Sequence, residues 1–314
     1  MSDMLYAVAH AADLNPAALR RFLEEQIYTL PGTDRHREQF SILLTGSRAT
    51  GMHEPESDVD LDIFCPRPVY EAVSEACRAA GIIEAKKSFF CVTRERCFGA
   101  HVGFPHFSLL PLDTLARDLR AYSDVPIWIW TQAKVITDPG EQFGRTLALF
   151  QGYPPEVLVR KLKYHWLRSE YAHIAIFPNH PRDSGDLLAA LTGLADGIND
   201  LLRVFFLVEG RPFPYTEKLL RYADTTALGR RWGPFLQEAM ETVVGLQEAE
   251  QSPWDRLNRV REMLICDEED PTAKALWEDC ERALIGAGVE PEWVAADFHN
   301  IDELLTGELG PAPQ

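Results

Sequence analysis

Apolar residues change their spacing along the chain, from short runs in the first third to helical periodicity in the remainder. The runs at residues 41–45 and 59–64 end at Gly or Pro, which is typical of buried strands, and further strands are expected near 87–92 and at 106–110. Residues 68–80 have the spacing of a helix that ends at the following Gly. This alternation of strands and a helix predicts an α/β unit in the N-terminal part of the chain.

From about residue 112 the periodicity is helical, interrupted by one short extended stretch at residues 134–137. Helices are expected at residues 140–150, 155–175, 184–209, 214–223, 230–248, 254–266, 271–285 and 298–306. A chain of 314 residues is long enough for two cores. We therefore expect an α/β domain over residues 1–138 and a helical domain over residues 139–314.

The charge balance narrows the class of partner. The formal net charge is −17, and no block of the sequence is dense in Lys or Arg. A protein that grips a nucleic-acid backbone needs a basic surface to displace counterions, so a long DNA or RNA partner is not expected. An acidic surface suits a cationic small molecule, although acidity that serves only solubility explains the same composition.

The cellular location is predicted from three features that the sequence lacks. There is no run of about 18 apolar residues, so a membrane span is not expected. The N-terminal residues lack the basic start and apolar core of a signal peptide. The six cysteines are scattered without a CxxC pair, which favours reduced thiols over a structural zinc site. Together these features predict a cytoplasmic protein.

Three aspartates alternate with apolar residues in the predicted strand at 59–64. Alternate side chains of a strand share one face, so Asp58, Asp60 and Asp62 are expected to point the same way. Carboxylates in such a row repel one another unless a cation lies between them. Hard oxygen ligands suit Mg²⁺, which bridges protein carboxylates to substrate phosphates. The alternative is an edge strand whose acidic side chains face water.

A turn at Gly46-Ser47 precedes this strand by about ten residues. Glycine allows a phosphate to approach the main chain, and free N–H groups with the Ser47 hydroxyl are suited to its oxygens. Arg48 follows directly, and its planar guanidinium matches an oxyanion, although a solvated surface arginine fits the sequence nearly as well. The combination predicts a phosphate-binding turn beside a metal-binding pair, Asp58 and Asp60.

This arrangement resembles the DNA polymerase β-like nucleotidyltransferase superfamily, which is marked by Gly-Ser followed by a strand bearing Asp-x-Asp. The resemblance implies a mixed sheet with flanking helices for residues 1–138. It also implies that Asp58 and Asp60 bind Mg²⁺, and that Gly46 and Ser47 bind a nucleoside triphosphate. In the reaction of that superfamily, an acceptor hydroxyl attacks the α-phosphorus of the nucleotide and pyrophosphate leaves.

One departure from the superfamily concerns the third carboxylate, which usually comes from a later strand. The corresponding strand here has His106 and Ser108 on one face and no acidic residue on it. Asp62, Glu84 or Glu95 is one source of the missing charge. His106 as a general base is a second explanation, because histidine accepts protons near neutral pH. A weakened or lost catalytic activity is the third.

The helical part contains the run of residues 201–215, which is followed closely by Glu217-Lys218. This part resembles the C-terminal domains of aminoglycoside and lincosamide adenylyltransferases and of related uncharacterised bacterial nucleotidyltransferases. The resemblance implies that Lys218 binds the triphosphate, with ATP as donor of AMP and a small molecule as acceptor. A surface role for Lys218 is the alternative. Aromatic and acidic residues would suit a cationic sugar, and the helices carry Trp166, Tyr171, His173, Asp183, Asp186 and Asp196.

Two rival functions remain compatible with the sequence. In one, the same chemistry modifies a protein partner, although such enzymes usually lack a long helical part. In the other, the protein binds a nucleotide without catalysis, which the missing third carboxylate would explain. Turnover with a panel of acceptors distinguishes these functions from the adenylyltransferase.

Overall fold

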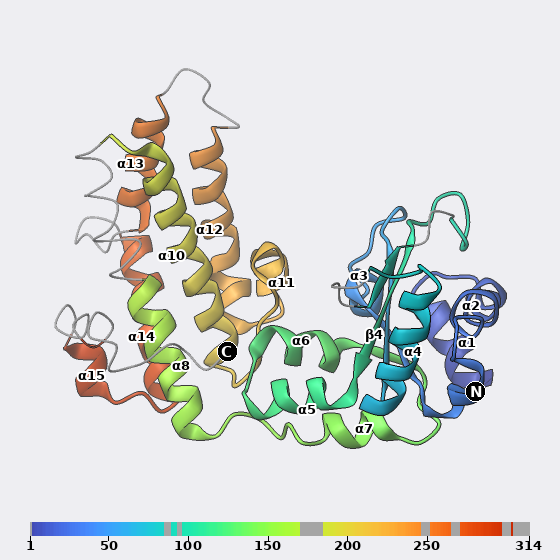
Figure 1. Cartoon of the computed structure of the whole chain (residues 1–314). Coiled ribbons are helices and arrows are strands. Elements are labelled where there is room, and N and C mark those ends of the chain that lie inside the picture. Colours follow the sequence, from blue (N-terminus) through green and yellow to red (C-terminus); the bar gives the residue numbers. More distant parts are fainter. Residues whose placement is uncertain are drawn as a thin grey trace. The chain divides into compact units, whose positions relative to one another are not determined.

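The computed structural model shows two compact units, Met1–Gln151 and Gly152–Gln314 (Figure 1). It describes residues 2–84, 89–92, 96–169, 185–245, 252–264, 271–296 and 303. The first unit extends beyond the expected boundary at residue 138 because helix α7 (Gln142–Leu147) packs on its sheet. The ring centroid of Phe143 in α7 lies 5.5 Å from that of Phe64.

A five-stranded mixed sheet forms the centre of the first unit, as predicted. Its strands are β1 (Ser41–Thr45), β2 (Val59–Cys65), β3 (Phe90–Val92), β4 (Pro105–Pro111) and β5 (Lys134–Thr137). Their order across the sheet is β3-β4-β2-β1-β5. Strands β2 and β4 are parallel, and the other pairs are antiparallel. The parallel pair at the centre brings residues from two distant segments of the chain into register.

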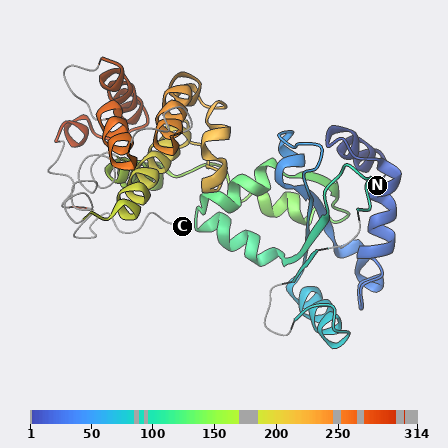
Figure 2. The same cartoon turned by 90° about the horizontal axis from the view of Figure 1, so that it is seen from above.

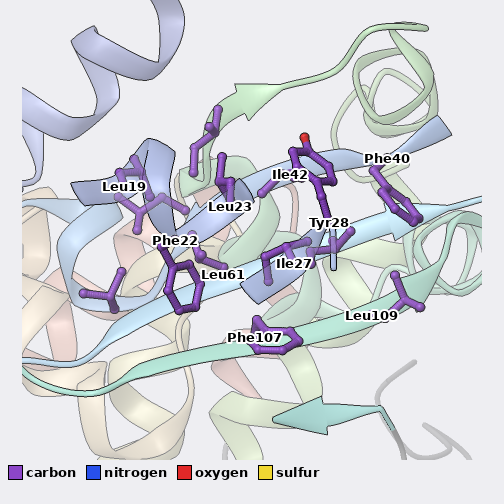
Figure 3. Packing of buried hydrophobic residues seen from close by; sticks show 14 of the residues in the cluster. Leu19, Phe22, Leu23, Ile27, Tyr28, Phe40, Ile42, Leu61, Phe107 and Leu109 are labelled. Atoms are coloured by element: carbon purple, nitrogen blue, oxygen red, sulfur yellow. The ribbon is translucent and has the colours of Figure 1, made fainter. Parts of the chain in front are cut away.

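One face of the sheet is continuously apolar and carries the larger core of the first unit. Helices α1 (Ser2–Ala11), α2 (Pro16–Phe22) and α4 (Arg67–Ala79) and the short π-helix η1 (Leu23–Ile27) contribute to it. Asn15 begins α2 by accepting hydrogen bonds from the N–H groups of Ala17 and Ala18. In Figure 3, Phe22 lies against Phe107 and Leu61 of the sheet. Helix α1 was not among the helices expected from the sequence.

The opposite face carries a smaller core and the acidic residues. Helices α5 (Leu112–Arg120), α6 (Asp124–Gln132) and α7 lie on that face of the sheet (Figure 2). Their apolar side chains pack against Leu43 and Phe64. The indole ring of Trp130 in α6 lies edge-on to Phe64, with 5.5 Å between ring centroids. The residues that follow Leu43 and precede Phe64 on this face are polar. The apolar core therefore ends where the predicted site begins.

The second unit is helical, as predicted. Its helices in the described part of the chain are α8 (Pro155–Leu167), α10 (Leu187–Leu207), η4 (Thr216–Lys218), α11 (Leu219–Ala223), α12 (Ala227–Val244), α13 (Pro253–Leu264), α14 (Pro271–Gly286) and α15 (Pro291–Ala295). Helix α12 starts at Ala227, earlier than expected, because the Thr226 hydroxyl accepts the N–H of Gly229 as an N-cap. The helix expected at 298–306 lies outside the described residues, apart from residue 303.

A buried aspartate joins α8 to α10 in the second unit. Asp200 is 1% exposed and accepts hydrogen bonds from Arg168 at 2.8 Å and Arg203 at 2.6 Å, with His165 Nδ1 at 2.8 Å. Burial alone would raise the pKa of Asp200, but the hydrogen bond and charge of His165 and the two guanidinium groups hold it below its ordinary value. Removing one member would leave buried charge uncompensated, so this network ties the two helices together.

In the parts of the chain that the structure describes, no helix has both the length and the apolar character needed to cross a bilayer.

Candidate active site

Strand pairing brings the Gly46-Ser47 turn against the second strand of the motif. In the antiparallel β1–β2 ladder, Thr45 is the partner of Asp60. The chain then turns at Gly46, which has φ +66°, and enters the short helix α3 (Gly46–Thr50). The sequence predicted a turn here rather than a helix. A Cβ atom on Gly46 would lie 2.1 Å from Oδ2 of Asp60, so only glycine lets this carboxylate rest on the backbone.

The parallel pairing of β2 with β4 adds His106 to the two aspartates of the motif. Asp60 and His106 are partners across the two strands. The His106 ring lies between both carboxylates, with Nδ1 3.5 Å from Oδ1 of Asp60 and Nε2 3.8 Å from Oδ2 of Asp58. The ring also lies edge-on to Phe90 of β3, 5.7 Å between centroids. The structure thus brings together Gly46, Asp58, Asp60 and His106 at one edge of the sheet face.

The electrostatics of this group favour a bound cation. Burial raises the pKa of Asp60, the neighbouring His106 lowers it, and the negative charge of Asp58 raises it again. A divalent cation between Asp58 and Asp60 would offset the repulsion between them. Within the described residues, no group of three His, Cys, Asp or Glu side chains is arranged to hold a metal. Two carboxylates nevertheless fit Mg²⁺, because this ion keeps several waters and takes further oxygens from substrate phosphates.

Ser47 follows Gly46 at the start of α3 and retains hydrogen-bonding capacity. Its side chain is half-buried, and its hydroxyl forms no hydrogen bond with the described part of the chain. The first N–H groups of a helix have no acceptor within that helix. At the start of α3, these N–H groups and the Ser47 hydroxyl are therefore donors suited to phosphate oxygens.

Asp62 shares the face of Asp60 but differs in its surroundings. Burial raises the pKa of Asp62 from its ordinary value of 3.8 to about 6, although side-chain hydrogen bonds with Thr45 and Trp130 lower it. Asp62 thus interacts with Trp130 of α6 inside the first unit. No motif in the sequence indicated this contact. Of the other proposed sources of a third carboxylate, Glu84 is exposed in the loop after α4, and Glu95 lies outside the described residues.

Arg48 has a different role from the one its sequence position indicated. Its side chain is buried, 2% exposed, and its guanidinium donates hydrogen bonds to three backbone carbonyl groups. Nε and Nη2 bond Ser57 O at 3.2 and 2.9 Å, Nη2 bonds Pro55 O at 2.8 Å, and Nη1 bonds Ala12 O at 3.0 Å. Neither the phosphate contact nor the solvated surface position fits these bonds. Arg48 instead fixes the loop between the Gly-Ser turn and Asp58.

The residues expected to contact substrate from the helical part lie in the second unit. Lys218 is half-buried at the end of η4. Trp166 is a core residue, 2% exposed, with its ring centroid 5.3 Å from that of Trp277. Asp186 accepts the N–H of Ala189 and caps α10. Asp196 is half-buried on α10, whereas Tyr171, His173 and Asp183 lie outside the described residues.

The segment that carries the Gly-Ser turn and the Asp-x-Asp strand is similar to a known domain family. Residues 33–96 match the family model of the nucleotidyltransferase domain, a segment that contains β1, α3, β2 and α4. The predicted resemblance to the DNA polymerase β-like superfamily is thereby confirmed. Nucleotidyl transfer is the general class of activity that this match supports.

The other comparisons are less specific. No curated protein matches the chain. A solved structure that matches is that of a nucleotidyltransferase-like protein from Exiguobacterium sibiricum 255-15. Its sequence identity is 12% over 86% of this chain and 77% of that chain, with a TM-score of 0.40.

The buried position of Arg48 predicts a large loss of stability when its side chain is removed. Arg48→Ala removes the guanidinium that donates to three backbone carbonyl groups, one of them buried, so the free energy of unfolding is expected to fall by about 3 kcal/mol. Urea unfolding followed by circular dichroism measures this change. Arg35→Ala, at an exposed position of the same unit, is the matched control and is expected to change stability little. An Arg48→Ala protein as stable as the control would contradict the structural role.

The raised pKa of Asp62 predicts a pH dependence of stability in the metal-free protein. Because the pKa in the folded state exceeds the unfolded value, the folded state binds more protons in this range. The associated stability is present below about pH 4 and is lost as the pH rises through about 6. A shift of about two units corresponds to about 3 kcal/mol. Asp62→Asn should remove this part of the pH dependence of the free energy of unfolding, whereas the exposed Asp34→Asn should retain it.

Proposed function

We propose that this protein transfers a nucleoside monophosphate, AMP from ATP, to a hydroxyl group of a small-molecule acceptor and releases pyrophosphate. The observation that carries the proposal is the Asp60 carboxylate resting on the backbone of Gly46, with Asp58 and His106 beside it. This group joins a metal-binding pair to a phosphate-binding turn within a segment that matches nucleotidyltransferase domains. The choice of AMP rests on the resemblance of the helical part to adenylyltransferases.

The residues of the first unit have separate tasks in the proposed reaction. Asp58 and Asp60 hold Mg²⁺, which supplies charge stabilisation at the phosphates when it is bound. The Ser47 hydroxyl and the N–H groups at the start of α3 hold phosphate oxygens of the nucleotide. Gly46 keeps these two groups in contact, because any side chain there would displace the Asp60 carboxylate. The reacting phosphate is thereby oriented for in-line attack.

His106 is the proposed general base. The acceptor oxygen forms a bond with the α-phosphorus, its hydroxyl proton passes to His106, and the bond from the α-phosphorus to the bridging oxygen of pyrophosphate breaks. His106 suits this task because its ring lies against both metal-binding carboxylates and is partly accessible, with 23% of the side chain exposed. It also lies directly opposite Asp60 on β4, and the third carboxylate of the superfamily usually comes from such a later strand.

The second unit is proposed to contribute Lys218 and to bind the acceptor. The match of Lys218 to the triphosphate-binding lysine of similar enzymes supports a role in neutralising the departing pyrophosphate. The net charge of −17 favours a cationic acceptor such as an amino sugar over a nucleic acid. Binding of such an acceptor does not require a basic surface of the kind that binds nucleic acid.

A nucleotide-binding protein without catalysis is the second candidate function. The observation that favours it is the presence of His106, not an acid, beside Asp60. Binding of ATP with Mg²⁺ in the absence of pyrophosphate release, across a broad panel of hydroxylated acceptors and protein partners, would support this second function. Release with any acceptor supports the enzyme.

Substitution of the central aspartate tests the proposed site. Asp60→Asn removes a metal-binding charge without changing the side-chain volume, so pyrophosphate release is expected to fall by about 10²-fold or more. The far-ultraviolet circular dichroism and the melting temperature should stay close to those of the wild type. Asp34→Asn, at an exposed position of the same unit, should retain full activity. Turnover of Asp60→Asn at the wild-type rate would refute the site assignment.

The proposed roles of His106 and Lys218 differ in their kinetic signatures. His106→Gln should lower kcat by about 10²-fold with little change in KM for ATP, because a general base acts in the transition state. Lys218→Ala should raise KM for ATP and lower kcat/KM, because it removes a charge that binds the triphosphate. Steady-state pyrophosphate release at varied ATP measures both. Equal and small effects from the two variants would contradict these assignments.

A further inference from the structure

A segment outside the Gly-Ser and Asp-x-Asp motifs holds the first metal-binding aspartate. The chain that enters β4, residues 103 and 104, runs beside residues 57–59, which enter β2. Gly103 N–H donates to Ser57 O at 3.2 Å, and Val59 N–H donates to Phe104 O at 3.2 Å. Between these two backbone bonds, the N–H of Phe104 donates to Oδ1 of Asp58 at 2.9 Å. The Asp58 carboxylate is therefore tied to the main chain of the segment that enters β4.

The absence of a side chain at residue 103 makes this contact geometrically feasible. A Cβ atom on Gly103 would lie 2.5 Å from Oδ1 of Asp58, 2.6 Å from Glu56 O and 2.7 Å from Asp58 N. Two of these three atoms belong to the backbone, so they cannot move aside as a flexible side chain does. Gly103 is also buried. Any other residue would push the 103–104 segment away from Asp58.

The hydrogen bond divides the two oxygens of Asp58 between two tasks. Oδ1 receives the Phe104 N–H, while Oδ2 lies 3.8 Å from Nε2 of His106 and thus faces the group shared with Asp60. A hydrogen bond from a neutral N–H to a carboxylate is stronger than one between neutral groups. It restricts rotation of the carboxylate and so reduces the ordering cost when a cation binds.

We propose that Gly103 and the Phe104 N–H act as positioning residues that orient Asp58 for binding of the divalent cation. This inference rests on the proposed function of Asp58 and Asp60 as metal ligands. Neither residue touches substrate or metal. Their effect on catalysis is transmitted through one carboxylate, and it should therefore be largest at low metal concentration.

Replacement of Gly103 tests this role in the full-length protein. Gly103→Ala should bind Mn²⁺, used as a paramagnetic probe, about tenfold or more weakly than the wild type by electron paramagnetic resonance. His101→Ala, at an exposed position of the same loop, is the matched control and should bind Mn²⁺ like the wild type. At saturating Mn²⁺ the kcat of Gly103→Ala should approach the wild-type value, whereas a general loss of structure would not be rescued by metal.

A second measurement needs no substitution at Gly103 and no activity. In amide-detected NMR spectra of the metal-free protein, Asp58→Ala should shift the Phe104 N–H resonance upfield and speed its hydrogen exchange. Asp60→Ala should leave both nearly unchanged. A Phe104 resonance that does not respond to Asp58→Ala would overturn the proposal, even if Gly103→Ala failed to fold.

The outcomes separate this inference from the proposed function. Weaker Mn²⁺ binding by Gly103→Ala in a protein without nucleotidyl transfer would support the positioning role and refute the enzyme. Normal transfer in the wild type with unchanged Mn²⁺ affinity in Gly103→Ala would refute the positioning role alone. A wild type that does not bind Mn²⁺ would refute both.

Discussion

The parallel pairing of β2 with β4 is the constraint on which the proposed site depends. This pairing places His106 beside Asp60 and the Phe104 N–H beside Asp58. The antiparallel pairing of β2 with β1 places Gly46 under the Asp60 carboxylate. Because side chains on a strand alternate between faces, a slip of one residue in either ladder would move these groups to the opposite face. The apolar cores on both faces of the sheet stabilise the observed register.

The two faces of this sheet explain why acidic residues are tolerated in a buried strand. Val59, Leu61 and Ile63 pack into the continuous core against α2 and α4, which supplies apolar burial for the strand. The opposite face is apolar only near Leu43 and Phe64, where α6 and α7 cover it. Asp62 lies beneath α6, next to Trp130, whereas Asp60 lies outside the region that α6 and α7 pack against. The strand thus combines an apolar face that is buried in the larger core with a carboxylate, Asp60, that lies outside the smaller core.

Both units contain buried charged side chains that stabilise the fold. Arg48 lies next to the turn that is proposed to bind phosphate, yet it donates its hydrogen bonds to backbone carbonyl groups of Ala12 and of the loop that leads to Asp58. In the second unit, Asp200 holds two arginines and a histidine between α8 and α10. In each case, several hydrogen bonds compensate for the cost of burying the charge. A charged side chain near a motif is therefore not evidence of a ligand contact by itself.

The amino-acid sequence by itself determined the strands at 41–45 and 59–64, the glycine turn between them, most helices of the second unit and the nucleotidyltransferase resemblance. These features depend on local periodicity and on motifs whose residues lie within about twenty positions of one another. The tertiary structure decided the burial of Arg48, the raised pKa of Asp62 beneath Trp130 and the contact of Gly103 with Asp58. Those contacts join residues from separate segments, and only the pairing of strands and the packing of α6 bring them together. Short elements such as α3 and α15 also escaped prediction, because a helix of five residues has too few turns to show a periodic pattern.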